Sequence, residues 1–300
     1  MTPMRNFLLL LITLFFLNCN NNAIKREDFV KVESLVDKQD FKSALKILNE
    51  IIKQNKDFDS AYVERAFVYL NLNELEKAIK DADEAIRINF ANNSAYYVRA
   101  LIYGVKQDYE KALKDYSHII NIGDSLYSPL ALMERAHIHD FYGEYNKAKK
   151  DFEHLLEIDS LNILALNGKA LMHSRLFEDS IAFDIYTRSI LIDSLFSDTY
   201  FKRGSLLHAL FNDLDGALND LNKAISIDSS VSEYYMIRGL IYNRLNKLNY
   251  AIADLDYAIK LDPSNGYAFL NRAYIKEYSL NDLKGAEKDY SHAMKLGIEK

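Results

Sequence analysis

The chain has 300 residues, of which 49% are hydrophobic and 27% charged, with only 3 Pro and 10 Gly, so its composition excludes a disordered chain. Its 37 Lys and Arg against 43 Asp and Glu give a net charge of −6, which argues against a nucleic-acid partner because nothing compensates the phosphate charge. Its single cysteine, Cys19, excludes an internal disulfide and a cysteine-based zinc or iron–sulfur site.

The first twenty residues have the layout of an export signal. Arg5 supplies a positive charge, and an apolar run of 11 residues, Phe7 to Leu17, is broken only by Thr13. A membrane-spanning helix needs about 20 apolar residues, so this run is too short to stay in the bilayer. Cys19 closes the sequence Phe16-Leu17-Asn18-Cys19, which resembles the lipobox of bacterial lipoproteins. That family prefers Leu, a small residue and then Gly, Ala or Ser before the cysteine, and this chain departs from the preference.

The lipoprotein resemblance implies a signal peptide at residues 1–18, an acylated N-terminal Cys19 and a short polar tether at 19–24. We therefore expect a lipid-anchored protein of the bacterial cell envelope, attached to the membrane through its acyl chains. Asn20 is not the Asp associated with inner-membrane retention, which favours the outer membrane, while the periplasmic or surface face stays open. The alternative is an ordinary secretory signal cut nearby, which leaves a lone thiol.

From residue 25 to 299 the chain repeats itself. AYVERAFVYL from Ala61 aligns with AYYVRALIYG from Ala95 at an offset of 34 residues, and the frame returns at Ala131 and Glu233. Each unit holds two segments with apolar residues at helical spacing and a polar turn between them, which predicts a pair of antiparallel helices. The units lie at about 25–58, 59–92, 93–126, 129–162, 163–196, 197–231, 232–265 and 266–299.

The pattern within a unit resembles the tetratricopeptide repeat family, which has a small residue at the eighth position, an aromatic or apolar one at the eleventh, Ala at the twentieth, an aromatic residue or Leu at the twenty-fourth and Ala at the twenty-seventh. In the second unit the matching residues are Ala66, Tyr69, Ala78, Ala82 and Ala85. The resemblance implies an all-α fold, a right-handed α–α superhelix or solenoid of about eight helix–turn–helix repeats. Two units carry an extra residue near Phe211 and Leu280, which we expect in the turn without a change of helix register.

Six units carry Arg at the seventh position, and the same six carry Asp at the twenty-third. The first and fifth units lose both, with Lys31 and Ile47, then Lys169 and Ile185. This joint occurrence predicts a partly exposed ion pair between the two helices of each unit. The pairs are Arg65 and Asp81, Arg99 and Asp115, Arg135 and Asp151, Arg203 and Asp220, Arg238 and Asp254, and Arg272 and Asp289.

Catalytic patterns are missing from the sequence. The seven histidines form no HExxH motif or cluster, and no glycine-rich phosphate loop or GxSxG motif occurs. The repeats also use up the chain. We therefore predict a protein that is not an enzyme and binds no cofactor or metal.

The inner helices of such an array usually line a groove that binds a protein or peptide partner. Carried over from the family, the groove positions are Val63, Phe67, Leu70, Tyr97, Leu101, Met133, His137, Asp140, Phe141, Asn167, Leu171, Arg175, Phe201, His208, Met236, Leu240, Arg244, Leu270, Tyr274 and Tyr278. For each of these residues, packing against a neighbouring helix is an equal alternative. The lysine of the family's carboxylate clamp is missing from the fifth position, which disfavours a chaperone C-terminus as partner.

The sequence thus predicts a scaffold or adaptor that binds a segment of another envelope protein. An alternative is an architectural spacer or a pilotin-like assembly lipoprotein that contacts partners through its ends. The chain stops at Lys300 directly after the last predicted helix, so we expect Leu283, Tyr290 and Met294 on an uncovered end that frays, self-associates or binds a partner.

Overall fold

The computed structural model describes residues 26–298, and within them the chain is all-α, with sixteen α-helices and no strand. The predicted signal peptide, Cys19 and the tether lie outside the described residues. None of the described helices combines the length and the apolar character that crossing a bilayer requires. The helices are α2 (Arg26–Asp37), α3 (Phe41–Gln54), α4 (Asp59–Asn71), α5 (Leu75–Ile88), α6 (Asn93–Val105), α7 (Tyr109–Ile122), α8 (Tyr127–Phe141), α9 (Tyr145–Ile158), α10 (Ile163–Arg175), α11 (Asp179–Ile192), α12 (Ser197–Leu206), α13 (Leu214–Ile227), α14 (Ser232–Arg244), α15 (Leu248–Leu261), α16 (Gly266–Tyr274) and α17 (Leu283–Lys295).

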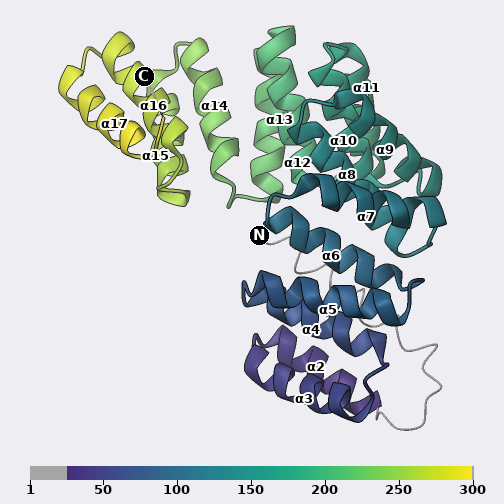
Figure 1. Ribbon diagram of the computed structural model, residues 1–300. Helices are drawn as coiled ribbons and strands as arrows, with labels where there is room; N and C mark the ends of the chain where they lie inside the picture. The colour runs from purple at the N-terminus through teal and green to yellow at the C-terminus, as the bar shows by residue number, and fades with distance from the viewer. Residues whose placement is uncertain (1–25, 299–300) are drawn as a thin grey trace. The chain divides into compact units, whose positions relative to one another are not determined.

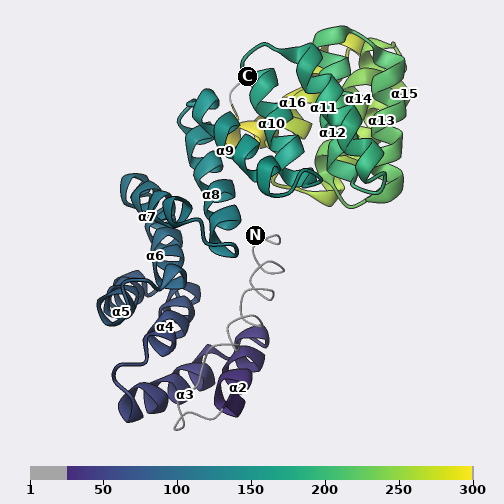
Figure 2. The ribbon, with the colours of Figure 1, turned by 90° about the vertical axis from the view of Figure 1, so that its right-hand side faces the viewer.

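The chain divides into two compact units, Met1–Ile138 and His139–Lys300, and the boundary lies within α8. In the N-terminal unit, each helix from α2 to α6 packs on the next helix of the chain (Figure 1). In the C-terminal unit, α9 to α17 do the same, and Figure 2 shows α11 to α15 as neighbours. Each unit is therefore a stack of helical hairpins, and the fold class is the solenoid that the repeats predict.

Small residues lie where two helices of a hairpin cross. Ala78, Ala112 and Ala251 stand at the twentieth repeat position on second helices, and none has any exposed surface. Gly239 lies opposite Ala251, and a Cβ at Gly239 would lie only 3.2 Å from the Ala251 carbonyl oxygen. The hairpins can pack this closely because no bulky side chain separates the two backbones.

One residue in each turn between the helices of a hairpin takes a left-handed conformation. Such a residue commonly ends a helix, and glycine or asparagine adopts it at least cost. Phe177 breaks this preference, since it has φ 63° and its side chain is 91% exposed. The left-handed residues in these turns are Gln39, Asn73, Gln107, Gly143, Phe177, Asn212, Asn246 and Asn281.

The two extra residues change the helix itself, so the expectation of an unchanged register is wrong. In both long repeats the first helix ends in a π-helix, η2 (Leu207–Phe211) or η3 (Ile275–Ser279). The amide of Leu280 donates to the Ile275 carbonyl at 3.1 Å, five residues back. A π-turn absorbs one residue by widening the helix, so the following turn keeps its place.

Candidate protein-interaction surface and its supporting ion pairs

Five of the predicted Arg–Asp pairs are formed, each as a two-pronged hydrogen bond between the helices of one hairpin. In the pair of α14 and α15, Nε and Nη2 of Arg238 donate to the two carboxylate oxygens of Asp254, both at 2.8 Å. The other four have donor–acceptor distances between 2.6 and 2.8 Å. They join Arg65 to Asp81, Arg99 to Asp115, Arg203 to Asp220, and Arg272 to Asp289.

These pairs are more buried than the sequence led us to expect. The carboxylates of Asp81, Asp115 and Asp289 are 5%, 4% and 2% exposed as whole residues. Burial alone would raise the pKa of Asp289, but hydrogen bonds from Arg272 and Lys276 outweigh it and lower that pKa below the usual value. Removing one partner therefore leaves a charge that water reaches poorly, which costs far more than breaking a surface pair.

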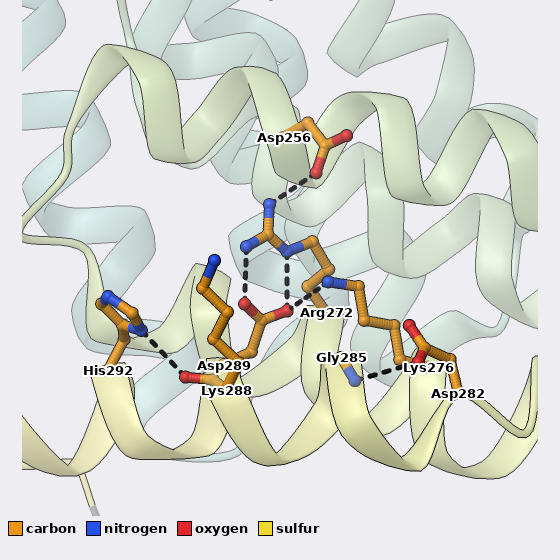
Figure 3. Close-up of polar contacts among 8 residues, drawn as sticks. All are labelled: Asp256, Arg272, Lys276, Asp282, Gly285, Lys288, Asp289 and His292. Atoms are coloured by element: carbon orange, nitrogen blue, oxygen red, sulfur yellow. Dashed lines mark hydrogen bonds and ion pairs between the residues drawn. The ribbon is translucent and has the colours of Figure 1, made fainter.

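Each arginine also makes a third contact, which the sequence analysis missed. Nη1 of Arg272 donates to Asp256 at 2.6 Å, so this guanidinium joins α16 both to α17 and to the second helix of the preceding hairpin (Figure 3). Asp256 lies sixteen residues before Arg272, at the twenty-fifth position of the preceding repeat, and only the acceptor of Arg135 has a different spacing, eighteen residues. The corresponding acceptors are Asn49 for Arg65, Asp83 for Arg99, Ser117 for Arg135, Thr187 for Arg203 and Asn222 for Arg238. A polar residue at that position in every preceding repeat was the available signal.

The fourth and fifth repeats differ. Arg135 and Asp151 belong to different units, so their pairing stays a prediction. Lys169, which replaces the arginine in the fifth repeat, lies 3.0 Å from Glu153 of the preceding helix. The longer glutamate preserves the link between repeats where the link within the repeat is lost.

The predicted groove residues fall into three groups by exposure. Five are exposed and lie in the C-terminal halves of first helices, and these include Phe141 at 71% and Tyr278 at 72%. The exposed members are His137, Phe141, Arg175, Arg244 and Tyr278. The half-buried members are Phe67, Leu70, Met133, Asp140, Leu171, Phe201, His208, Met236, Leu240, Leu270 and Tyr274.

Four predicted groove residues are core residues, and the prediction is wrong for them. Val63, Tyr97, Leu101 and Asn167 are 6%, 6%, 8% and 3% exposed. Three of them stand at the fifth repeat position, where the side chain meets the first helix of the next repeat. The Tyr97 ring lies 5.8 Å from that of Tyr127, centroid to centroid. At Asn167, a network of polar side chains takes the place of this apolar contact.

That network is buried between α10, α11 and α12. Asn167 donates to Thr199 Oγ1 at 2.7 Å and accepts from Ser189 Oγ at 3.0 Å. Neither Ser189 nor Thr199 has exposed surface. Because each polar group finds a partner, the three residues fix the register of neighbouring hairpins.

Two pairs of predicted groove residues meet. Arg244 donates through Nη1 to the His208 carbonyl oxygen at 2.9 Å and through Nη2 to Asn212. Burial, then the charge of Arg244, lowers the pKa of His208. The rings of Tyr274 and Tyr278 stack with centroids 6.1 Å apart. The C-terminal unit thus presents a partly ordered surface of tyrosine, arginine and aliphatic side chains.

On α17, two of the three residues expected at an uncovered end are exposed. Leu283 is 62% and Met294 is 65% exposed, and both line a shallow hollow of about 660 Å³. Tyr290 is 9% exposed, and its hydroxyl donates to Glu277. Self-association through this face stays a prediction.

Two histidines have carboxylate partners, but the described residues gather no set of three side chains suited to bind a metal ion. Nδ1 of His139 lies 2.6 Å from Glu144, and Nδ1 of His173 lies 2.5 Å from Glu178. Both histidines stand at the eleventh repeat position, where the second, third and seventh repeats carry Tyr69, Tyr103 and Tyr242.

Comparison with protein families finds tetratricopeptide repeat models that match residues 29–94, 130–160 and 232–265. Comparison with curated proteins finds no matching sequence. Among solved structures, a tetratricopeptide repeat protein from Parabacteroides merdae is 19% identical with a TM-score of 0.63, covering 89% of this chain and 98% of that one. Yeast Tom70 is 17% identical with a TM-score of 0.65, covering 93% of this chain and 62% of that one. The Cut9 and Hcn1 complex of the APC/C matches at 14% identity and a TM-score of 0.62, over 90% of this chain and 52% of that one.

The fold and the matched segments define the class, an all-α solenoid protein. Three of its segments match tetratricopeptide repeat models, and proteins built from such repeats are generally non-catalytic scaffolds that bind other proteins.

Proposed function

We propose that the protein is a non-catalytic adaptor that holds a peptide or a helix of another cell-envelope protein on the first helices of its repeats. The observation that carries the proposal is the row of half-buried and exposed apolar side chains on those helices. In the C-terminal unit the row includes Leu171, Met236 and Leu240, and it ends at the 72% exposed Tyr278. Apolar surface that recurs in successive repeats is costly unless a partner covers it.

We further propose that acylated Cys19 anchors the adaptor in the bacterial envelope, with the outer membrane as the favoured site. Support comes from the sequence, where the sole cysteine directly follows an apolar segment too short to span a bilayer. Cys19→Ala should move the protein from the membrane fraction to the soluble fraction. Membrane retention of this variant would contradict the anchor.

Charge on the apolar surface tests the adaptor. Phe141→Glu combined with Tyr278→Glu places two carboxylates on the predicted surface. Phe90→Glu combined with Tyr250→Glu is the matched control, because these side chains are 79% and 64% exposed and lie outside it. Envelope proteins crosslinked to the wild type should be lost from the first variant and kept by the control.

The same crosslinking experiment distinguishes the adaptor from the alternative, a protein that contacts its partners through its ends. A spacer or pilotin-like lipoprotein would keep its partners in both double variants and lose them when the exposed α17 face is charged by Met294→Glu. That result would replace the adaptor by an end-contact function.

A further inference from the structure

The exposed face of α17 carries the residues by which other second helices join the next hairpin. Leu283 and Met294 stand at the repeat positions that Leu214 and Ile225 occupy on α13. Leu214 and Ile225 are half-buried and pack against apolar clusters that include residues of α14. On α17 the same two positions are 62% and 65% exposed, and no helix within residues 26–298 covers them. This face therefore has the residues of a helix-binding surface but lacks a helix in the described part of the chain.

The described residues that follow α17 pack on α16 and not on this face. Gly297 takes the left-handed conformation, with φ 82°, and the amide of Ile298 donates to the Ala293 carbonyl oxygen at 3.0 Å, a pattern that commonly ends a helix. A Cβ at Gly266, where α16 begins, would lie only 2.5 Å from Cγ1 of Ile298. Ile298 thus packs at the start of the hairpin and leaves the exposed face of α17 open.

The hollow of about 660 Å³ lies on the same face of α17. Leu283 and Met294 line it near the two ends of the helix, about 16 Å apart along the helix axis. Between them, Ala286 and Tyr290 line it as buried side chains, 2% and 9% exposed. A helix can approach closely where a small residue such as Ala286 lies between bulkier neighbours. The hollow therefore has the length and the side chains to receive another helix.

The charges beside the hollow indicate which helix this is. Glu287, Ser291 and Lys295 line it at intervals of four residues, so they lie along one side of α17. Glu287 and Lys295 are exposed, and neither makes an ion pair within residues 26–298. A rotation of 180° about an axis through Ser291 exchanges the positions of Glu287 and Lys295. The face is therefore complementary in charge to an antiparallel copy of itself.

We propose that α17 pairs antiparallel with α17 of a second copy of this chain, about a two-fold axis close to Ser291. Met294 of each copy enters the hollow of the other, and Glu287 of each copy meets Lys295 of the other, so both contacts occur twice. The small Ser291 side chain at the axis lets the two backbones approach. Because the same face is used on both copies, the assembly closes at two chains.

This dimer goes beyond the proposed adaptor function, which uses the first helices of the repeats, and it does not rest on that function. A dimer presents two adaptor surfaces, so a partner with two binding segments is held more tightly than by one chain. One helix from each copy buries less than the roughly 1,600 Å² of a standard interface, so the dimer should dissociate on dilution.

Exchange of the two charges tests the pairing. The full chain in a mild detergent is followed by sedimentation velocity between about 1 and 500 µM, a range that spans a weak interface. Glu287→Lys and Lys295→Glu each turn two attractive contacts into repulsive ones and should weaken dimerisation about tenfold. An equimolar mixture of the two variants should regain the dimer, because every contact between them is attractive again. Glu157→Lys makes the same charge change at an exposed position of α9 and should alter dimerisation less than about twofold.

A thiol at the two-fold axis locates the contact. In the full chain with Cys19→Ala, Ser291→Cys supplies the only thiol, and mild oxidation should link most of the protein into disulfide-bonded pairs. Facing residues of two helices packed about 8–10 Å apart lie within the Cα separation that a disulfide spans. Ala253→Cys, at an exposed position of α15, is the matched control and should stay unlinked. Equal linking of both variants would overturn the placement of the axis.

Three other results would overturn the proposal. A chain that sediments as a monomer at about 500 µM has no such dimer, and its hollow is then left to a helix of another protein. A dimer that both charge variants leave unchanged uses a different face. Assemblies that grow beyond two chains show an open head-to-tail contact instead of a closed pair. The adaptor is scored apart, by the partners that Phe141→Glu with Tyr278→Glu loses, and can stand where this inference falls.

Discussion

Removing one carboxylate tests how strongly the ion pairs hold a hairpin together. Asp254→Ala deletes the acceptor of two hydrogen bonds at 2.8 Å and leaves the Arg238 guanidinium with its bond to Asn222. The side chains of Arg238 and Asp254 are 18% and 11% exposed, so water replaces only part of the lost interaction. Breaking a fully buried pair on one side costs about 3–5 kcal/mol, and with this exposure we expect about 2–4 kcal/mol.

Urea unfolding followed by circular dichroism measures the loss, and hydrogen exchange locates it in α14 and α15. The double-mutant cycle with Arg238→Ala separates the pair's coupling from the cost of the stranded charge. Glu84→Ala, which breaks an exposed pair with Arg87 inside α5, is the control and should leave the unfolding midpoint almost unchanged. If Asp254→Ala unfolds at the same urea concentration as this control, the pairs do not stabilise the hairpins.

Three further predictions concern single residues. Phe177→Asn should raise the free energy of unfolding by about 0.5–1 kcal/mol, since asparagine tolerates φ 63° better than a bulky side chain, as a shifted urea midpoint would show. Asn167→Leu should lower the free energy of unfolding by about 2–3 kcal/mol because Ser189 and Thr199 lose a buried hydrogen-bond partner. A free energy of unfolding within about 0.5 kcal/mol of the wild type would refute this prediction. Burial raises the pKa of Glu64 from 4.5 to about 7, so the folded state is fully stabilised by the protonated carboxyl below about pH 4.5 and loses this stabilisation as pH rises through 7. Glu64→Gln should therefore increase the free energy of unfolding by an amount that grows between pH 4.5 and 7. An increase that does not depend on pH would contradict this prediction.

The sequence was sufficient for the parts of the fold that recur. A period of 34 residues with alanine at helix crossings predicted the hairpins, because only small residues allow two helices to pack so closely. Joint occurrence of arginine and aspartate also predicted a contact that the structure shows in detail for Arg65 and Asp81. Each of these signals is repeated several times, so chance matches average out.

The surface could not be predicted as well, because the same repeat position has different surroundings in different repeats. Tyr97 and Met133 both stand at the fifth position, yet Tyr97 is buried between two tyrosines while Met133 is half-buried. The burial of Tyr97 depends on Tyr116 of its own repeat and on Tyr127 ahead of the next repeat, a combination that no single-repeat pattern contains.

The fifth repeat keeps links to both neighbouring hairpins although it has lost the ion pair within it. It has lost the arginine and the aspartate, yet Lys169 reaches back to Glu153 and Asn167 reaches forward to Thr199. In a solenoid, each repeat is stabilised largely by its two neighbours, so a hairpin that keeps both links can lose its internal pair. The contact of the arginines with the preceding hairpin recurs with acceptors as different as Asp256 and Thr187, so different polar side chains at that position can join one hairpin to the next.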